Sequence, residues 1–140
     1  MTQRLFSEKY AGGILAVANH ISDFCEQGKI VSYIGDRDDH DEFINSALDP
    51  AIQTSFISKK NSPTILKTRF IDNYSKTKTL GVYDINDELL SNGEESKILD
   101  ILDTEISNYD AVIVTDYGHG LITPDIVKFL EKYAKFLAVN

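Results

Sequence analysis

Residues 111–140 read AVIVTDYGHGLITPDIVKFLEKYAKFLAVN, and their pattern decides the fold class. The continuous apolar run at the start is typical of a strand in a parallel sheet that is covered on both faces. Thr123-Pro124-Asp125 then predicts a helix start, with Thr123 as the N-cap and Pro124 in the first turn. FLAVN (136–140) has the pattern of a second strand. Strand, helix and strand in this order predict an α/β protein with a parallel sheet.

The segments that come earlier in the chain extend this pattern. Gly12-Gly13 opens a run of small and apolar residues that fits a buried helix face, and Cys25 near its end is expected to be a buried, inert thiol. Asp39 or Asp41 is the expected N-cap of the next helix. The expected elements are helices over 14–24, 41–48 and 94–107 and a buried strand over 29–35.

Residues 52–85 differ from the rest because they are rich in β-branched and aromatic residues with frequent alternation. Three strands are expected there, and no helix. Lys67 and Arg69 would share one face of the middle strand between isoleucines. This face either lines a binding site or carries ordinary cross-strand surface pairs. The whole chain, 1–140, is taken as one domain.

The composition excludes several classes of protein. The formal net charge of −8 argues against a surface that binds nucleic acid or an anionic membrane. No apolar run approaches the length of a membrane span, and the N-terminus lacks the apolar centre of a signal peptide. Cys25 is the only cysteine, so no intrachain disulfide can form. A reduced, cytoplasmic setting is expected, and the spacing of His and Cys gives no zinc site.

Two strand ends are candidate sites, because ligands of parallel sheets bind beyond the carboxyl ends of the strands. Gly35-Asp36 follows the first strand, and Asp116-Tyr117-Gly118-His119-Gly120 follows the strand at 111–115. Asp116 could accept hydrogen bonds from substrate hydroxyls, bind Mg²⁺ through water, or simply cap its own loop. His119 could contact a phosphate or a hydroxyl, or remain an exposed loop residue. The amides of Gly12-Gly13 could hold an oxygen-rich ligand.

The order of these features resembles the PfkB family of carbohydrate kinases. The resemblance rests on Gly12-Gly13 before a small-residue helix, on PTILKTR (63–69), and on VIVTDYGHGLIT (112–123). It is closest to the heptose-kinase-like branch, whose members are often fused to a cytidylyl- or adenylyltransferase. The resemblance implies a partial ribokinase-like α/β sandwich with a small β lid at 52–85.

The resemblance also implies a function and a site. It implies ATP- and Mg²⁺-dependent phosphorylation of a sugar or sugar phosphate by a full-length parent protein. Gly12, Gly13 and the 116–120 loop would lie near the sugar, whereas Lys67 and Arg69 would lie near the lid and the transferred phosphate. Lid strands of such kinases often pair between subunits, so 52–83 could form a homodimer interface.

The sequence departs from this family at three places. Ala16 stands where the family has a sugar-binding asparagine, and Asn19, three residues later, is the candidate replacement. His119 stands where the heptose-kinase-like loop has lysine. The G-A-G-D segment, which supplies the anion hole and the catalytic base, is absent. We therefore expect a truncated fragment that binds no cofactor and phosphorylates nothing by itself.

Two alternatives remain open. The chain could be a non-catalytic sugar-binding or dimerisation module of a bifunctional nucleotidyltransferase, which kept the fold and lost the chemistry. It could instead be an unrelated flavodoxin-like binding domain, but the strand-only stretch at 52–85 argues against the regular alternation of that fold.

Overall fold

The computed structural model describes residues 5–38 and 40–140, and the chain divides into two compact units. The first unit is Met1–Ile30 with Asp41–Thr54, and the second is Val31–His40 with Ser55–Asn140. Asp39, one of the two expected N-caps, lies outside the described residues. The helices and strands in chain order are α1 (Ile14–Ile21), β1 (Gly28–Gly35), α2 (Asp41–Ala47), β2 (Ile52–Lys59), β3 (Leu66–Ile71), β4 (Lys78–Asp84), α3 (Asn92–Glu105), β5 (Val112–Val114), α4 (Pro124–Tyr133) and β6 (Leu137–Val139).

The first unit contains α1, α2 and the opening residues of β1 and β2. Gly13 is the N-cap of α1 with φ 56°, a left-handed conformation that glycine adopts without steric cost. The buried apolar side chains of this unit are Ala18, Ile30, Ile44 and Ile52.

The expectation for the end of the first helix is wrong. α1 stops at Ile21, a short 3₁₀ turn follows, and Phe24 and Cys25 are exposed. The thiol of Cys25 donates to the carbonyl of Ile21 at 3.3 Å. The α-helix therefore ends about one turn earlier than the apolar pattern predicts.

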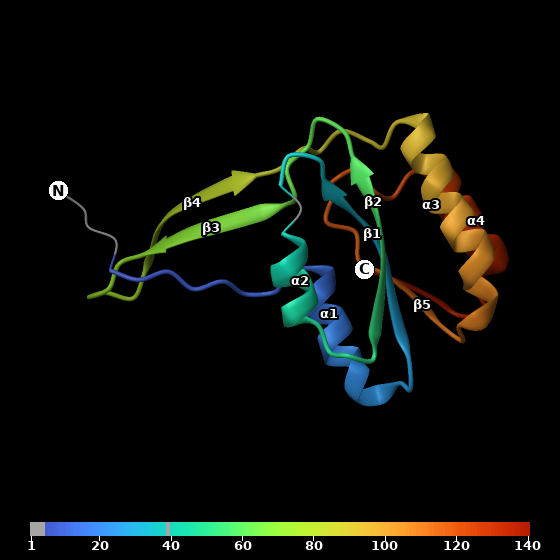
Figure 1. Ribbon diagram of the computed structural model, residues 1–140, viewed down its shortest axis with the longest axis horizontal. Helices are drawn as coiled ribbons and strands as arrows, with labels where there is room; N and C mark the ends of the chain where they lie inside the picture. Colours follow the sequence, from blue (N-terminus) through green and yellow to red (C-terminus); the bar gives the residue numbers. More distant parts are fainter. Residues whose placement is uncertain (1–4, 39) are drawn as a thin grey trace. The chain divides into compact units, whose positions relative to one another are not determined.

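The second unit confirms the α/β class with parallel strands. β5 and β6 pair in parallel, with Val112 opposite Leu137 and Val114 opposite Val139. β1 and β2 also run side by side in the same direction, as Figure 1 shows. Within this unit α3 packs against α4. The core that joins the two helices to the strands consists of Tyr33, Ile57, Leu90, Ile98, Ile106, Val114, Ile126 and Leu130.

The helix starts of this unit follow from local chemistry. Thr123 is the N-cap of α4 as predicted, and its Oγ1 accepts from the N–H of Ile126 at 3.3 Å. α3 begins with a capping box, in which Ser91 and Glu94 satisfy each other's backbone and side-chain groups. No helix in residues 5–38 and 40–140 is long and apolar enough to cross a membrane.

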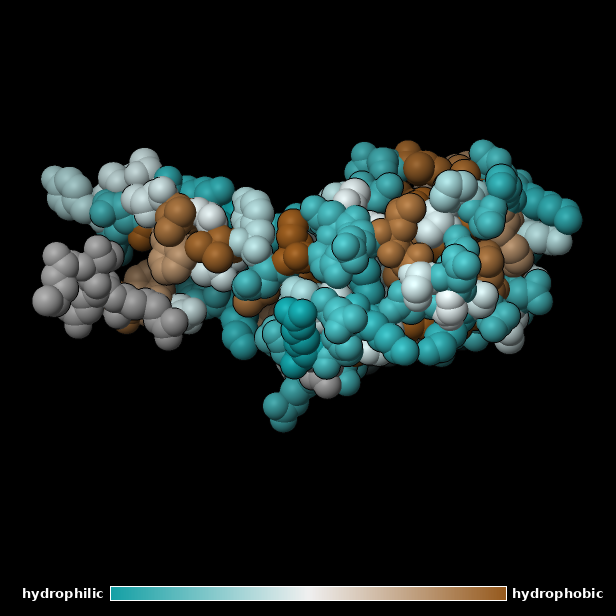
Figure 2. Space-filling view, turned by 90° about the horizontal axis from the view of Figure 1, so that it is seen from above, coloured by the Kyte–Doolittle hydropathy of each residue, from teal (hydrophilic) through white to brown (hydrophobic). Residues whose placement is uncertain are grey.

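β3 and β4 form an antiparallel hairpin with two unlike faces. Strand β2 pairs with β1, so the antiparallel part of the expected 52–85 segment is confined to 66–84. Lys67 lies opposite Tyr83, and Arg69 lies opposite Gly81, on one face. The other face carries exposed apolar side chains, and Figure 2 shows brown patches over the hairpin. We call this second face the apolar hairpin face, and its large members are Leu66, Phe70, Leu80 and Val82.

Candidate functional site

The candidate site lies at the carboxyl ends of three strands of the second unit. β1 ends at Gly35, β2 ends at Lys59, and the loop 116–120 follows β5. The N–H of Asp36 donates to the carbonyl of Lys59 at 3.2 Å, so the first two ends lie side by side. The hydroxyl of Tyr33 donates to the carbonyl of His119 at 2.8 Å, which brings the third end to the same place. The two candidate loops, at Gly35-Asp36 and at 116–120, therefore lie at one edge.

The end of β1 is hydrogen-bonded to the turn that follows β2. The carboxylate of Asp36 accepts from the N–H of Asn61 at 3.0 Å and from that of Ser62 at 3.1 Å. The Asn61 hydrogen bond, with that from Ser62, outweighs partial burial and lowers the pKa of Asp36. A Cβ at Gly35 would lie 2.2 Å from the backbone of Pro63, so only glycine fits. An open hollow of about 430 Å³ adjoins these hydrogen bonds. It is lined by Ile34, Gly35, Asp36, Arg37, Asp38 and Ser58.

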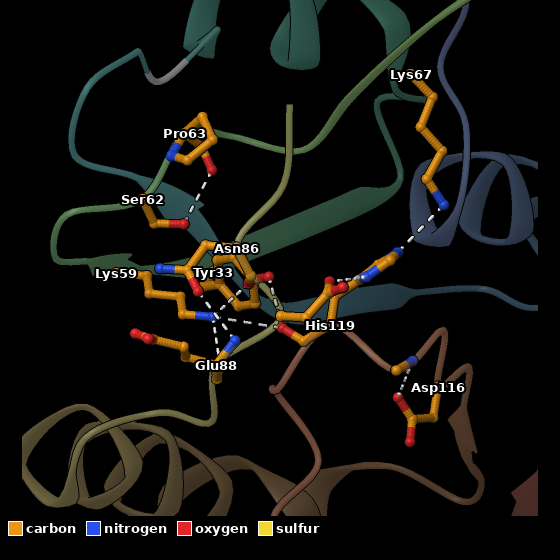
Figure 3. A network of polar contacts seen from close by, with 11 residues as sticks. Tyr33, Lys59, Ser62, Pro63, Lys67, Asn86, Glu88, Asp116 and His119 are labelled. Atoms are coloured by element: carbon orange, nitrogen blue, oxygen red, sulfur yellow. Dashed lines mark hydrogen bonds and ion pairs between the residues drawn. The ribbon is translucent and has the colours of Figure 1, made fainter. Parts of the chain in front are cut away.

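Lys59 is buried at the centre of the site (Figure 3). The residue is 2% exposed, and its ammonium donates to the carbonyls of Asn86 at 2.8 Å and Glu88 at 2.6 Å. A longer hydrogen bond of 3.4 Å reaches the carbonyl of His119. Burial lowers the pKa of Lys59, and the negative charges of Glu94, Glu88 and Asp87 oppose this shift. One ammonium therefore ties the segment after β4 to the loop after β5.

The aromatic ring of Tyr33 packs against the ammonium of Lys59. Lys59 Nζ lies 4.8 Å from the centroid of the ring, a distance suited to a cation–π contact. Burial raises the pKa of Tyr33 to about 12, and the charge of Asp87 adds to the effect. The phenol therefore stays protonated at neutral pH and remains a donor to the carbonyl of His119.

Glu94 supplies the countercharge from the first turn of α3. Its Oε1 accepts from the N–H of Lys60 at 2.7 Å, and its Oε2 accepts from the N–H of Ser91 at 2.8 Å. Burial alone would raise the pKa of Glu94, but hydrogen bonds from the Ser91 hydroxyl and these N–H groups, together with the charge of Lys59, lower it. A carboxylate with all these donors is stable despite being 7% exposed.

His119 joins the hairpin to the 116–120 loop. Its Nε2 lies 3.1 Å from Nζ of Lys67, and its Nδ1 lies 2.7 Å from Oδ1 of Asp87. Figure 3 shows Lys67 reaching down from β3 to the imidazole. The structure thus brings together two of the predicted site residues, Lys67 and His119, from segments 52 residues apart.

The two glycines of this loop meet different demands. Gly118 has φ 73° and nothing near the position of a Cβ, whereas Gly120 has φ 81° and a Cβ there would lie 1.9 Å from the carbonyl oxygen of Glu88. Between them the loop turns tightly while its backbone touches the segment before α3. Asp116 caps this turn by accepting from the N–H of Gly118 at 2.9 Å. The loop-capping interpretation of Asp116 thus accounts for one of its carboxylate oxygens.

The other predicted site residues lie elsewhere. Arg69 lies on β3 two residues beyond Lys67, on the same face, and is exposed. Gly12 and Gly13 are exposed at the start of α1 in the first unit. The amide of Asn19 donates to the carbonyl of Ala47 at 2.7 Å and accepts from the N–H of Asp49 at 2.8 Å. Asn19 therefore braces α1 against the end of α2.

Sequence reasoning missed Lys59, Tyr33 and Asp87. A signal for Lys59 exists, because it continues the alternation of β2 on the same side as the buried Ile57. A lysine at a buried strand position requires partners and is a candidate functional residue. Nothing local marks Asp87, since its role depends on a histidine 32 residues away.

The described residues do not form a metal centre. Within residues 5–38 and 40–140, no group of three His, Cys, Asp or Glu side chains could hold a metal ion.

The sequence of this chain is similar to that of several known proteins. The chain is 25% identical over 139 residues to the bifunctional protein HldE of Campylobacter jejuni subsp. doylei, covering 99% of the chain and 28% of the relative. The HldE protein of Campylobacter fetus subsp. fetus is 26% identical over 94% of the chain. That of Granulibacter bethesdensis is 29% identical over 84% of the chain. No family model matches the sequence. The chain spans less than a third of the length of these relatives.

Proposed function

We propose that this chain is the sugar-side and lid portion of a PfkB-type carbohydrate kinase, acting on a sugar or sugar phosphate. The order of its motifs resembles that family, and bifunctional HldE proteins match it over nearly its whole length. ATP and Mg²⁺ belong to the activity of the parent protein. In this chain, the sequence offers no G-A-G-D segment to supply an anion hole and a base.

One observation carries the proposal: Lys67 of the hairpin meets His119 of the 116–120 loop at 3.1 Å. The resemblance assigns these two segments to the phosphate and the sugar. An ammonium and an imidazole are thus in contact, and a carboxylate, Asp116, belongs to the same loop as the imidazole. An ammonium favours a phosphate, and a carboxylate oxygen accepts hydrogen bonds from hydroxyls. The set suits a ligand that carries both groups.

Two residues beneath the 116–120 loop hold its backbone in place. Lys59 and Tyr33 both donate to the carbonyl of His119, so the backbone of the loop is held by part-buried hydrogen bonds. A binding site whose backbone is fixed in advance loses less entropy when it binds a ligand. The same support suits a non-catalytic sugar-binding module as well as a kinase.

The test is a nuclear magnetic resonance titration of the purified chain with a hexose phosphate, the matching free hexose and inorganic phosphate. We expect the hexose phosphate to shift the amides of residues 116–120 and of β3. Lys67→Met should weaken this binding roughly tenfold or more, because one hydrogen bond to a charged group is lost. The matched control is Lys78→Met, a lysine of β4 that contacts Tyr83. Equal binding of inorganic phosphate and hexose phosphate would remove the sugar from the proposal.

A second experiment concerns catalysis. The purified chain, incubated with ATP, Mg²⁺ and the hexose phosphate that binds best, should transfer no phosphate. Positioning and charge stabilisation carry phosphoryl transfer, and the segment that would supply them is absent from this sequence. Detection of a phosphorylated sugar above a no-enzyme control would contradict this part of the proposal.

A second candidate function, dimerisation, is favoured by the apolar hairpin face. Phe70 is 46% exposed and lies opposite Leu80, which is 55% exposed. Apolar side chains gathered on one face of a two-stranded hairpin favour burial against a partner. The resemblance suggests a second copy of the chain as that partner.

Sedimentation of the chain over a range of concentrations tests this candidate. A dimer that Phe70→Lys converts to monomer would support it, because a charge at the centre of an apolar interface is costly. Tyr74→Lys, at the fully exposed tip of the hairpin, is the control and should leave the dimer intact. A chain that remains monomeric at all concentrations would exclude the interface.

A further inference from the structure

The imidazole of His119 lies between groups of opposite charge. The carboxylate of Asp87 contacts Nδ1 at 2.7 Å. The ammonium of Lys67 contacts Nε2 at 3.1 Å, as Figure 3 shows. The side chain of His119 is 16% exposed, whereas that of Asp87 is 57% exposed. The ring is therefore enclosed by the two contacts and not free to turn in water.

The chemistry of the two partners fixes the protons on this ring. An ammonium has donors and no acceptor, so Nε2 must present its lone pair to Lys67. Nδ1 then carries the only ring proton and donates it to Asp87. The observed geometry thus belongs to the neutral imidazole in its Nδ1–H form, with one neighbour that requires an acceptor and one that requires a donor.

The other charged groups around His119 contact its backbone. Lys59 from β2 and Tyr33 from β1 both donate to the carbonyl oxygen of His119. Asp116 of the same loop accepts from the N–H of Gly118. Among the described residues, the charged groups in contact with the ring itself are Asp87 and Lys67. A proton added to the ring is felt mainly by these two side chains.

We propose that His119 is a proton-operated clamp that holds the β3–β4 hairpin to the 116–120 loop. A second proton turns Nε2 from an acceptor into a donor and gives the ring a positive charge. Lys67 then has no acceptor and faces a like charge at 3.1 Å, so it moves away. Asp87 keeps its partner, because a carboxylate binds an imidazolium at least as well as a neutral imidazole. Protonation therefore breaks one side of the contact selectively and frees the hairpin.

The clamp does not depend on the proposed function, because it is a property of the ligand-free chain. It would make the availability of Lys67 depend on pH. Lys67 is held by His119 when the ring is neutral, and it is released to bind an anion when the ring is charged. A ligand phosphate would favour the released state for the same reason. Binding of an anion and uptake of a proton are then coupled.

The first test is nuclear magnetic resonance of the chain with isotope-labelled histidine. His119→Gln identifies the signal of His119 among the three histidines, which include His20 and His40. At high pH we expect the Nδ1–H form, with Nε2 showing the shift of a hydrogen-bond acceptor. A proton found on Nε2 at high pH would overturn the assignment and the proposal with it.

The second test follows the hairpin as pH changes. Hydrogen exchange of the β3 and β4 amides, corrected for the intrinsic pH dependence of exchange, gives their protection. We expect protection to fall roughly twofold to tenfold, the effect of losing one hydrogen bond, with the same midpoint as the titration of His119. Protection that stays constant through that titration, or that changes with another midpoint, would refute the clamp.

Two variants and one control complete the test. His119→Gln places a neutral amide that can still accept from Lys67 and donate to Asp87, so the pH step should disappear with the hairpin held. Lys67→Met should give the low protection at every pH. Lys78→Met, the matched control on β4, should keep the wild-type step. A step that persists in His119→Gln would show that another group controls the hairpin.

Discussion

Lys59 and Lys67 are eight residues apart in sequence, both contact His119, and have opposite surroundings. Lys59 is buried, sits on an aromatic ring and donates to backbone carbonyls, including that of His119. Lys67 is exposed on the hairpin and contacts the His119 side chain. The buried lysine holds the loop in place, whereas the exposed lysine can exchange its partner. The same side chain thus serves as a structural support or as a binding group according to its burial.

The largest expected effect comes from removing the buried lysine. Lys59→Met leaves the carbonyls of Asn86 and Glu88 without their donor and the buried carboxylate of Glu94 without its nearest cation. We expect a loss of about 3–5 kcal/mol in the free energy of unfolding, measured with denaturant. Lys60→Met, at the next position, should change it by less than about 0.5 kcal/mol, because Lys60 contacts Glu94 through its backbone N–H. Equal effects of the two changes would refute the contrast.

The two glycines of the 116–120 loop give a second comparison, between a crowded and an open backbone position. Gly120→Ala should cost roughly 2–4 kcal/mol, because it combines a left-handed conformation with a clash against the carbonyl of Glu88. Gly118→Ala pays only the conformational part, about 1 kcal/mol, since the space around it is open. Thermal unfolding of both variants checks the order, and a larger loss for Gly118→Ala would contradict it.

Glu94 gives a smaller effect that depends on pH. An amide cannot replace both accepting oxygens, so Glu94→Gln should cost about 1–2 kcal/mol at neutral pH. Because the pKa of Glu94 is lowered on folding, its contribution to stability is complete above the ordinary carboxyl value. It is lost as the pH falls through the lowered value. The difference between wild type and variant should therefore shrink below about pH 4.5, and a difference that stays constant there would exclude this linkage.

The smallest effect on stability is expected at the exposed lysine. Lys67→Met should change the free energy of unfolding by less than about 0.5 kcal/mol, because an exposed polar contact contributes little net stability. Its effects should appear in ligand binding and in hairpin protection, as described above. A loss of stability comparable to that of Lys59→Met would show that the hairpin contact is structural.

Much of the fold could be predicted because its signals are local. The N-cap at Thr123 with Pro124 behind it, the apolar run of β5 and the glycine that ends β1 each follow from a few neighbouring residues. β2 was harder, because strand pairing depends on distant residues: its alternation predicted a strand but not that it would pair with β1. The first helix shows that an apolar pattern does not locate a helix end by itself, because α1 ends at Ile21 whereas the pattern continues to Phe24.

The site could be predicted only in part. His119 and Lys67 were identified as separate candidates, since each lies in a distinctive motif, but their contact depends on how the hairpin folds back. Asp87 and Tyr33 have no local signal. Lys59 has one, a charged residue at a buried strand position, and its significance emerges only from the three carbonyls that surround it.

The burial of Lys59 has a consequence for chemical labelling. An amine with a lowered pKa is a better nucleophile near neutral pH than an ordinary lysine, but acylating reagents cannot reach this one in the closed structure. Its modification must therefore wait for local opening of the segments that it ties together. The rate of that modification, read by mass spectrometry against the exposed Lys67, would report how often the segments around Lys59 open.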